Sequence, residues 1–393
     1  MNKKKLTIEN LKILTDEGFK DISKIKVGDI VYDYKGRKTK IKSKSRYNSN
    51  TYTIAFNNGV GINVGAKQVI ENTRKEIISS ARLRDKKGKI LRDKNGKLTN
   101  KRTFKHKEIT RKIATKDLYP IVNNYRAYLL NHFPYKTDLC YFKGNNNKLS
   151  LDPYLLGLLL GDGDIAGIKK NRSKGQPKYT VHSKKDPDLL SSITKLVRKY
   201  KDNLVRISKS DYDFRINGMH IREILKDLKL WGHTCYTKFI PIEYLMSNKE
   251  NRLAILQGLM DTDGSCSIKN DNKGQVVCEF DNTSKQLVEQ LGLLVYSLGG
   301  STDKLYKKKC KYRKKGKLIE LNHYCYRYSI RLPKELSAFR CKRKKALEKI
   351  IKSKYYNSKY FGLSIKGIKK AKKSTFYQIT LEKGLKHLSV IIL

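Results

Sequence analysis

The stretch LLGLLLGDG at residues 155–163 decides the fold of this chain, and it returns in altered form as LQGLMDTDG at residues 256–264. Each copy is an apolar run that ends in an acidic residue followed by glycine. Small residues fall four apart in each run, which places them on one face of a helix and lets two helix backbones approach closely. The pattern predicts two helices whose interface is made by Gly157, Gly161, Gly258 and Thr262.

If the two helices pack in this way, Asp162 and Asp263 emerge side by side at the shared end of the pair. Two carboxylates at such a junction can hold a hard metal ion, because hard cations prefer oxygen ligands. A single copy would be weak evidence, since an apolar helix with a glycine is more often plain core. Two copies, each ending in Asp-Gly, are hard to explain by core packing alone and predict a metal site.

Charge is the most informative feature of the composition. The chain has 393 residues, enough for two or three domains, and its 87 Lys and Arg against 36 Asp and Glu give a formal net charge of +51. Self-repulsion on this scale is costly without a polyanionic partner, so the composition favours a nucleic-acid-binding protein. The alternative is compositional bias, because Lys, Asn, Ile and Tyr are all plentiful, as an AT-rich coding sequence would produce.

The cysteines and the apolar segments bear on the setting of the protein. The seven cysteines are scattered and odd in number, and none forms a C-x-x-C pair. This pattern argues against a zinc site and even more against a disulfide framework. The basic start of the chain is not followed by an apolar run, and no segment approaches the roughly 18 apolar residues of a membrane helix. We expect no signal peptide, no membrane association and an intracellular, reducing setting.

The first part of the chain has the pattern of short strands separated by turn residues, which is typical of a β module. The run KILTDEGFK at 12–20, followed by IKVGD at 25–29, resembles the start of a Hint domain, the self-splicing module of inteins. ATKDL at 114–118 and FYQITLE at 376–382 resemble later pieces of the same module. The resemblance implies a mostly β, Hint-like domain formed by segments 1–150 and 351–393.

The residues that perform splicing in the Hint family are not matched in this chain. The Cys or Ser nucleophile aligns with Leu6, and the histidine of the family's Thr-x-x-His falls at Gln68. Leucine has no nucleophile, and the amide of glutamine cannot act as an imidazole does. The sequence closes on VIIL at 390–393, without the His-Asn that inteins cyclise. We expect a Hint-like scaffold that no longer splices.

A strongly basic insertion, ARLRDKKGKILRDKNGKLTNKRTFKHK, occupies residues 81–107. Lys87-Gly88 and Asn95-Gly96 are turn signals, and Asn-Gly is a strong cue for a short hairpin. The insertion is either a basic ribbon that lies along a DNA backbone or a solvated loop, and its composition favours neither reading.

The central part of the chain contains an internal repeat. Asp152-Pro153 is a good helix start, and the pattern from there predicts the element order αββαββα for residues 151–247. A capping box from Ser247 to Glu250 opens the second copy, which spans 248–350 and ends with a helix expected at 334–350. We predict an α+β fold with two pseudo-symmetric repeats in a domain at 151–350, beside the Hint-like domain.

This repeat resembles the LAGLIDADG (DOD-type) homing endonucleases in their two-motif, single-chain form. Beyond the two nonapeptides, the similarity extends to KFIP at 238–241, TSK at 283–285 and SLG at 297–299, all in the same order. The resemblance implies a site-specific, metal-dependent double-strand DNA endonuclease that acts in homing.

The resemblance also assigns the residues of the reaction. Asp162 and Asp263 would be the catalytic metal ligands, and the backbone carbonyls of Gly161 and Thr262 would help to complete the metal shell. Mg²⁺, or Mn²⁺, suits such an all-oxygen site and would activate water at the scissile phosphate.

Lys238 matches a lysine that assists catalysis in intein-type relatives, where it would stabilise charge in the transition state. The competing interpretation is a surface lysine beside a helix start. Asp261 lies one position off the catalytic aspartate, and Leu160 occupies the equivalent place in the first copy. We therefore expect Asp261 to be structural, as a cap or a pairing partner.

The strands that follow each motif would form two curved sheets over double-stranded DNA and read bases in the major groove. Two non-identical repeats in one chain imply a monomer and a long, asymmetric target. The candidate DNA contacts are basic residues on these strands, although each is individually more often a phosphate contact or a solvated side chain. They are Lys169, Lys170, Arg172, Lys178, Arg206 and Arg215 in the first copy, and Lys304, Lys307, Lys309, Lys311, Arg313, Arg327 and Arg331 in the second.

Three other functions compete with the endonuclease. An RNA-binding maturase, a cofactor of intron splicing, could use the same scaffold, but the intact acidic residues of both motifs argue against it. An active intein is disfavoured by Leu6 and Gln68. A catalytically inactive DNA-binding protein is the remaining alternative.

Overall fold

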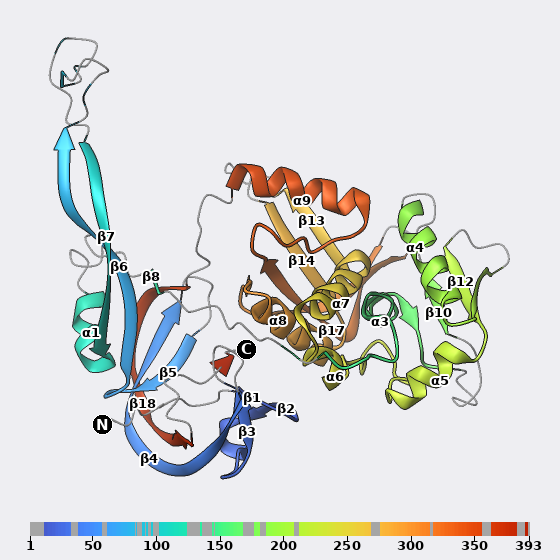
Figure 1. Ribbon diagram of the computed structural model, residues 1–393, viewed down its shortest axis with the longest axis horizontal. Helices are drawn as coiled ribbons and strands as arrows, with labels where there is room; N and C mark the ends of the chain where they lie inside the picture. The colour runs from blue at the N-terminus through green and yellow to red at the C-terminus, as the bar shows by residue number, and fades with distance from the viewer. Residues whose placement is uncertain are drawn as a thin grey trace.

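A computed structural model of the chain describes residues 12–32, 38–56, 61–82, 102–123, 134–135, 146–167, 177–180, 186–207, 212–268, 276–314, 317–355, 363–382 and 390–391, with isolated positions between 84 and 96 and at 144. Helices occur together with antiparallel sheets, so the expected mixture of α and β structure is confirmed. Figure 1 shows a mainly β region that contains both ends of the chain and a mixed α and β region built from its centre.

The β region contains one sheet with the strand order β19-β1-β3-β4-β18-β8, to which β2 and β5 add at the sides. Strands β4 and β18, each 19 residues long, pair antiparallel along most of their length, so segments from both ends of the chain build this sheet. The strands are β1 (Lys12–Thr15), β2 (Gly18–Asp21), β3 (Ile30–Tyr32), β4 (Lys38–Phe56), β5 (Gly61–Gly65), β8 (Pro134–Tyr135), β18 (Leu363–Leu381) and β19 (Val390–Ile391).

Two small cores lie along this sheet. One surrounds Ile54 and Ile368 and includes Leu118 of helix α1 (Thr115–Asn123). The other surrounds Ile13 and Ile379. A third, smaller cluster joins Leu14 of β1 and Tyr32 of β3 to Met246 of the central region.

A separate two-stranded ribbon is formed by β6 (Val69–Arg82) and β7 (Arg102–Ala114). The ribbon extends away from the first sheet (Figure 1). The basic insertion at 81–107 begins and ends in this ribbon, and most of its middle lies outside the described residues. Gly96 has a φ of +74°, the left-handed conformation that a glycine in an Asn-Gly turn adopts.

The central region begins with a first half that contains one four-stranded sheet, ordered β11-β12-β10-β9. Its elements follow one another as α3 (Pro153–Gly161), β9 (Gly163–Asp164), β10 (Lys178–Thr180), α4 (Pro187–Arg198), β11 (Asn203–Arg206), β12 (Asp213–Asn217) and α5 (His220–Asp227). Short helix α6 (Ile242–Leu245) then leads into the second half.

The second half has a five-stranded sheet ordered β13-β14-β17-β15, with β16 paired to β17. Its elements are α7 (Lys249–Thr262), β13 (Gly264–Ile268), β14 (Val276–Asn282), α8 (Lys285–Ser297), β15 (Ser301–Thr302), β16 (Tyr306–Lys314), β17 (Lys317–Arg331) and α9 (Lys342–Tyr355). Each half therefore begins with a motif helix, continues with strands and a helix, and closes with strands and a helix. None of the helices in the described part of the chain is long and apolar enough to cross a membrane.

The first motif helix begins where the sequence predicts. The side chain of Asp152 accepts hydrogen bonds from the N–H groups of Tyr154 and Leu155, and Pro153 occupies the first helical position. Asp152 thus satisfies two of the N–H groups that a helix start leaves without partners.

Two boundaries of the second half differ from the prediction. The cap of α7 is Asn248, whose side chain accepts from the N–H of Asn251, while the Ser247 hydroxyl donates to Tyr244, so the predicted capping box is wrong by one residue. Helix α9 begins at Lys342 rather than at 334. The later start has a physical cause, because the N–H groups that precede it are bound by the Asp261 carboxylate.

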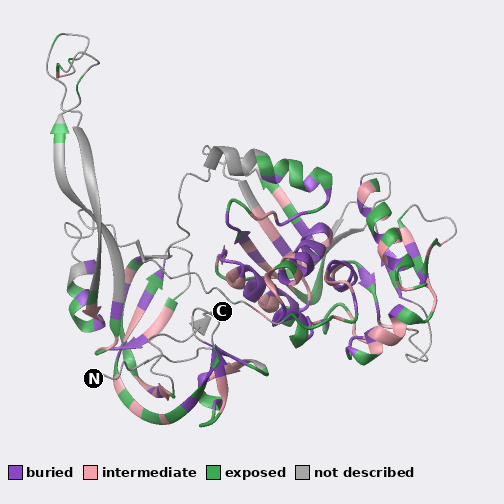
Figure 2. Ribbon diagram, in the orientation of Figure 1, coloured by how far each residue is buried: buried purple, intermediate pink, exposed green. Residues whose placement is uncertain are grey.

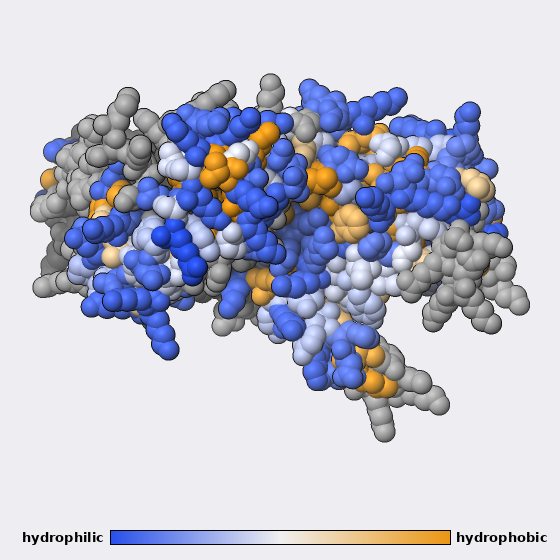
Figure 3. Space-filling view, turned by 90° about the horizontal axis from the view of Figure 1, so that it is seen from below, coloured by the Kyte–Doolittle hydropathy of each residue, from blue (hydrophilic) through white to orange (hydrophobic). Residues whose placement is uncertain are grey.

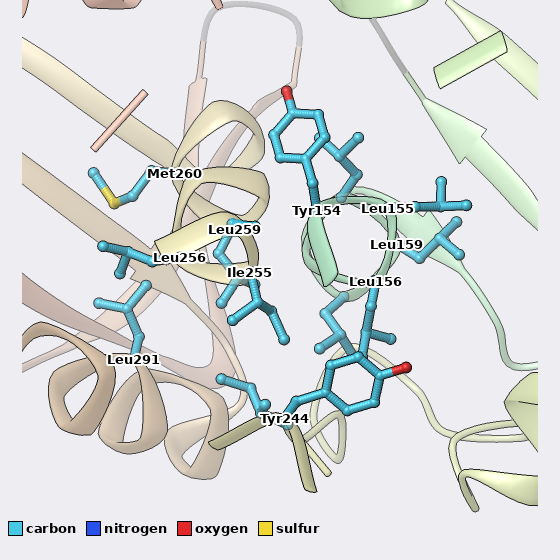
Figure 4. Packing of buried hydrophobic residues seen from close by; sticks show 14 of the residues in the cluster. Tyr154, Leu155, Leu156, Leu159, Tyr244, Ile255, Leu256, Leu259, Met260 and Leu291 are labelled. Carbon is cyan, nitrogen blue, oxygen red and sulfur yellow. The ribbon is translucent and has the colours of Figure 1, made fainter. Parts of the chain in front are cut away.

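The contact between α3 and α7 forms the centre of the main hydrophobic core. Figure 2 shows the buried residues concentrated on these two helices, and Figure 4 shows Ile255 and Leu259 of α7 lying between them. A Cβ added to Gly157 would overlap the carbonyl oxygen of Ile255, and one added to Gly258 would overlap that of Tyr154. Only glycine lets the two backbones come this close.

We predict that Gly157→Ala lowers the free energy of unfolding of the central region by at least about 2 kcal/mol, because the added methyl group must push the two backbones apart. Trp231, the single tryptophan, packs against this core, so its fluorescence in a urea titration reports the change. Ser191→Ala, at an exposed position of α4, is the control and should leave the midpoint unchanged. An unchanged midpoint for Gly157→Ala would show that the helix contact is not the constraint inferred here.

Candidate active site at the end of the paired helices

The two motif aspartates cap the C-terminal ends of the paired helices. Asp162 follows α3 and donates its backbone N–H to the Leu158 carbonyl, and Asp263 follows α7 and donates its N–H to Leu259. A Cβ on Gly161 would overlap the side chain of Thr262, so the residues that immediately precede the two aspartates are in contact. The structure thus brings Asp162 and Asp263 to one end of the helix pair.

The protein around the aspartates disfavours two bare negative charges. Burial and then the neighbouring charge of Asp263 raise the pKa of Asp162 to about 7, against the opposing effect of Lys344 and Lys238. Asp162 nevertheless keeps an exposed edge, so solvent screens part of this effect. Burial also raises the pKa of Asp263, with an opposing contribution from a hydrogen bond to Asn282.

Asn282 at the end of β14 is the side chain that holds Asp263 in place. Its amide nitrogen donates to Oδ2 of Asp263 at 2.7 Å, and its own Oδ1 accepts from the N–H of Ser284 at 2.8 Å. The bond to Ser284 at the start of α8 therefore fixes the orientation of the Asn282 amide, and the amide in turn fixes the orientation of the Asp263 carboxylate. No motif in the sequence singled out Asn282.

Lys238 is not a surface lysine, as one interpretation had it, but is buried with 3% of its surface exposed. Its Nζ donates to the carbonyl oxygens of Leu159, Leu160, Gly161 and Gly163 at 2.5–3.2 Å, which closes the C-terminal end of α3. A cation is favourable at this end of a helix because the unsatisfied carbonyls carry partial negative charge. Burial lowers the pKa of Lys238, and the two aspartates raise it.

Lys344 of α9 makes the same arrangement on the second helix, and the sequence analysis missed it. Its Nζ donates to the carbonyls of Met260, Asp261, Thr262 and Gly264 at 2.7–3.1 Å, the four positions of the second motif that correspond to those bound by Lys238. Burial lowers its pKa too. Lys344 lies in the basic run KRKKALEK and not at the 101-residue spacing of the aspartates, so no signal in the sequence separated it from its neighbours.

Asp261 has the structural role expected of it. Its carboxylate accepts the hydroxyl of Tyr154 at 2.6 Å and the N–H groups of Arg340 and Cys341 at 3.1–3.2 Å. These bonds connect α3, α7 and the segment that leads into α9. Asp261 therefore helps to place Lys344 at the end of α7.

The first sheet presents only some of its predicted DNA contacts on its open face. Lys178 and Arg215 are opposite each other on neighbouring strands and exposed, on the face away from buried Phe214 and Ile216. Arg206 is paired with Phe214 and lies over its ring at 5.7 Å, so it belongs to the edge of the other face. Lys169, Lys170 and Arg172 lie outside the described residues.

In the second sheet, alternation along the strands divides the predicted contacts between two faces. Lys307 and Lys309 are opposite Tyr326 and Tyr324, and Tyr326 packs against the core, so these lysines are on the helix-covered side of the sheet. Arg327 is on the open face. Lys308, which was not predicted, is opposite Cys325 and is also on the open face. Side chains alternate along a strand, so Lys308 faces away from the side of its neighbours Lys307 and Lys309.

Most of the second group of predicted contacts is already paired within the protein. Arg327 binds Asp281 in bidentate fashion at 2.7–2.8 Å and Glu279 at 3.0 Å, and Lys308 also reaches Asp281 at 3.3 Å. The other ion pairs join Lys309 and Lys311 to Glu320, and Arg331 to Asp303. Lys304 is exposed, and the side chain of Arg313 lies outside the described residues.

The donor atoms at the helix ends fit a hard divalent cation. Two carboxylates converge there, and a bound cation would offset the burial that raises the pKa of both. The carbonyls of Gly161 and Thr262 each accept a lysine Nζ at 3.1 and 3.0 Å, which leaves each oxygen a second lone pair. Among the described residues no group of three or more His, Cys, Asp or Glu could hold a metal, so protein carboxylates would supply only part of the shell.

The second half of the central region matches a known protein family. Residues 250–336, from α7 to β17, match the LAGLIDADG-like domain family, so the chain carries a LAGLIDADG-like domain and the resemblance seen in the sequence is confirmed. The ATP-dependent DNA helicase Hel308 of Thermococcus kodakarensis is 31% identical over 151 residues, which are 37% of this chain and 12% of the helicase. The chain therefore spans only a small part of that relative.

Two solved structures show limited overlap. The crystal structure of I-DmoI in complex with DNA and Mn is 16% identical, with 47% of this chain and 91% of that chain covered and a TM-score of 0.31. The crystal structure of the gp41-1 intein is 16% identical, with 28% of this chain and 87% of that chain covered and a TM-score of 0.16.

We predict that Asp162→Asn stabilises the protein when divalent cations are removed with EDTA, and more so as the pH rises. The unfolded chain releases this proton near pH 4, whereas the folded protein keeps it until about pH 7, so Asp162 costs the parent stability between these values. The asparagine variant lacks this contribution and keeps only that of Asp263. A full shift would be worth about 4 kcal/mol, and solvent screening at the exposed edge reduces the expected gain to about 1 kcal/mol at pH 8.

The measurement is the urea midpoint by Trp231 fluorescence between pH 4 and pH 8. Asp164→Asn removes an exposed carboxylate two residues away and serves as the control, whose profile should follow the parent. If Asp162→Asn also follows the parent at every pH, Asp162 does not experience the crowding described here.

Proposed function

We propose that this protein is a site-specific, metal-dependent double-strand DNA endonuclease of the homing type. The observation that carries the proposal is the pair Asp162 and Asp263 at the joined ends of α3 and α7, each end closed by a buried lysine. Asp263 lies inside the segment 250–336 that matches the LAGLIDADG-like domain family. The sequence contributes a net charge of +51, which suits a polyanionic partner. I-DmoI, one of the solved structures that the chain is similar to, was determined with DNA and Mn and is described as a homing endonuclease.

Asp162 and Asp263 would hold Mg²⁺ or Mn²⁺, with the Gly161 and Thr262 carbonyls beside them. Such a cation supplies an activated water and neutralises charge on the scissile phosphate. The two carboxylates supply the negative charge that attracts the cation, and Asn282 keeps the Asp263 carboxylate in one orientation. The tight helix contact fixes the spacing of the two aspartates, because their backbones follow directly from residues that touch.

Lys238 and Lys344 act here as positioning residues. Each ammonium group binds four carbonyls at the end of a motif helix, so it holds the turn that presents the aspartate. Their positive charges also lower the pKa of Asp162, which keeps more of it ionised and ready to bind a cation.

DNA would lie against the open faces of the two sheets. Lys178 and Arg215 on the first sheet and Lys308 and Arg327 on the second are the cations that the strand registers place on these faces. On the first face the exposed Asp164 is directly opposite Lys178. On the second face Glu279 and Asp281 bind Arg327, so the cations of the two faces are paired differently and the two halves of a target would be read differently. This asymmetry supports a monomer acting on a long, asymmetric site, with the two halves as related repeats.

We predict that the protein with Mg²⁺ cuts a defined subset of a randomised pool of double-stranded DNA. Asp162→Asn and Asp263→Asn should each slow cleavage of a recovered target by about two to three orders of magnitude, the scale expected when a preorganised charged group is removed. Asp227→Asn, at an exposed position of α5, is the control and should cut as the parent does. Sequencing of the cleaved ends is the measurement.

The same assay tests the two lysines. Lys238→Met and Lys344→Met should each slow cleavage about 10- to 100-fold, as expected for residues that orient a metal site, whereas exposed Lys345→Met should not. Binding of DNA without any cleavage would identify an inactive binding protein. Tighter binding to structured intron RNA than to any duplex would instead support a maturase.

Protein splicing is not part of the proposed function. In the Hint-like β region, Gln68 stands where splicing requires a histidine, and its amide nitrogen donates to the Val69 carbonyl at 3.3 Å. An amide at this position cannot shuttle a proton as imidazole does. We predict that a fusion with flanking sequences stays intact, as measured by mass spectrometry; ligated flanks would overturn this part of the proposal.

A further inference from the structure

The sheet of the second half brings four of the seven cysteines together as two cross-strand pairs. Cys266 and Cys278 are directly opposite each other on β13 and β14, with their sulfurs 2.9 Å apart as free thiols. Cys310 and Cys325 are joined by a disulfide across β16 and β17. The strands of the first-half sheet contain no cysteine. The sequence did not predict these two pairs, because only strand pairing brings together residues that are 12 and 15 positions apart.

The Cys310 and Cys325 pair has the geometry that a disulfide requires. Their Cα atoms are 5.6 Å apart, within the usual range. The register of the hairpin shifts between Lys309 and Lys311, so Cys310 is the residue at the irregularity. A bond from Cys310 to the opposite strand therefore fixes the hairpin where its own ladder is interrupted.

The same pair lies on the face of the sheet that the proposed function assigns to DNA. Cys325 is opposite Lys308, and Arg327 is the next residue on that face. Residues 320–324, beyond Cys325, are exposed on both faces, whereas Tyr328 and Ile330 are buried in the core. The end of the hairpin is thus supported by its own strand pairing and by the bonds of Glu320 to Lys309 and Lys311, at 2.8 and 3.2 Å. One contact reaches it from outside, the ring of Tyr236 against His323, with centroids 4.7 Å apart.

We propose that Cys310 and Cys325 are a site of reversible oxidation, and that their disulfide locks the β16–β17 hairpin in the form that binds DNA. This inference rests on the proposed function for the role of DNA, but the oxidation itself does not depend on it. Disulfides inside cells are usually transient and redox-sensing, which suits a pair on an exposed hairpin.

The oxidant is a low-molecular-weight disulfide such as glutathione disulfide. The thiolate of one cysteine attacks a sulfur of glutathione disulfide, which forms a mixed disulfide and releases one glutathione thiolate. The thiolate of the second cysteine then attacks the protein sulfur and releases the second glutathione. Two electrons pass from the protein dithiol to glutathione disulfide, and the two thiol protons end on the two glutathione molecules.

Oxidation should tighten DNA binding because the disulfide restricts the conformations of the hairpin before DNA binds. A hairpin end with solvent on both faces samples open and shifted registers when it is not cross-linked. The disulfide restricts this ensemble before DNA arrives, so less conformational entropy is lost on binding. Reduction releases the hairpin without removing any cation from the DNA-facing surface.

The other pair provides a matched control within the same sheet. Cys266 and Cys278 pack against the core, on the side of the sheet away from Arg327. Removal of one of their thiols deletes a cysteine from the sheet and leaves the hairpin unchanged.

The first measurement is made without DNA. The full-length protein is equilibrated in glutathione buffers of rising oxidation, the free thiols are alkylated, and the peptides are mapped by mass spectrometry. We expect a cross-linked Cys310–Cys325 peptide at the oxidising end, which disappears when the buffer is made reducing. Hydrogen exchange should be slower at 306–327 in the oxidised protein than in the reduced one. Thiols that stay alkylatable throughout, or unchanged exchange, would overturn the inference.

The second measurement is the Kd for a fluorescent random-sequence duplex, by anisotropy, in the oxidised and reduced protein. We expect about three- to tenfold tighter binding when oxidised, as preorganisation of one hairpin would give. Cys310→Ser should abolish the difference and Cys266→Ser should keep it. Equal Kd values in the parent would overturn the role of the disulfide in binding. Loss of all DNA binding in both states would count against the proposed endonuclease and leave the thiol mapping and exchange results standing.

Discussion

The close contact of α3 and α7 is the constraint on which the rest of the central region depends. Gly157 and Gly258 leave no room for a side chain between the helices, and the surrounding apolar residues bury both of them from nearly all sides. Because the helices cannot slide or separate without opening this core, their ends are held together. A pair of aspartates that follows directly from these ends then becomes a fixed feature of the surface.

Charge balance at the helix ends follows from the same contact. The helix contact brings two carboxylates close to eight backbone carbonyls, which two lysines bind. The carboxylates are partly buried there. The lysines satisfy the carbonyls that every helix leaves unpaired at its C-terminus, and they partly offset the charge of the aspartates. The arrangement is the same on both helices, although Asp261 supports the second lysine and the first has no corresponding acid. In both halves a lysine therefore satisfies the carbonyls at the helix end, but the residues that support the two lysines differ.

The outer surface is organised by a different rule, the alternation of side chains along strands. On the second sheet this rule puts Lys308 and Arg327 on the open face and Lys307 and Lys309 on the other. Ion pairs with Glu279, Asp281 and Glu320 then occupy several cations that composition alone would count as free. Figure 3 shows a mostly hydrophilic face with small, separate hydrophobic groups, as expected for a protein whose apolar residues are largely used in its cores. The net charge of +51 therefore overstates how many cations are free to meet a partner.

The helix pair, the mixture of helices and antiparallel sheets, the cap at Asp152 and the candidate aspartates could all be predicted from the amino-acid sequence, because they depend on local pattern and on a motif that occurs twice. The sequence located Lys238 but not its environment. Lys344, Asn282, the late start of α9 and the cysteine pairs were decided only by the tertiary structure. Each depends on residues far apart in the chain, such as Asp261 with Arg340 or Cys310 with Cys325, and no local pattern records which strand or helix end will meet another. The register of the second sheet belongs to the same group, since a shift of one residue exchanges its two faces and the composition stays the same.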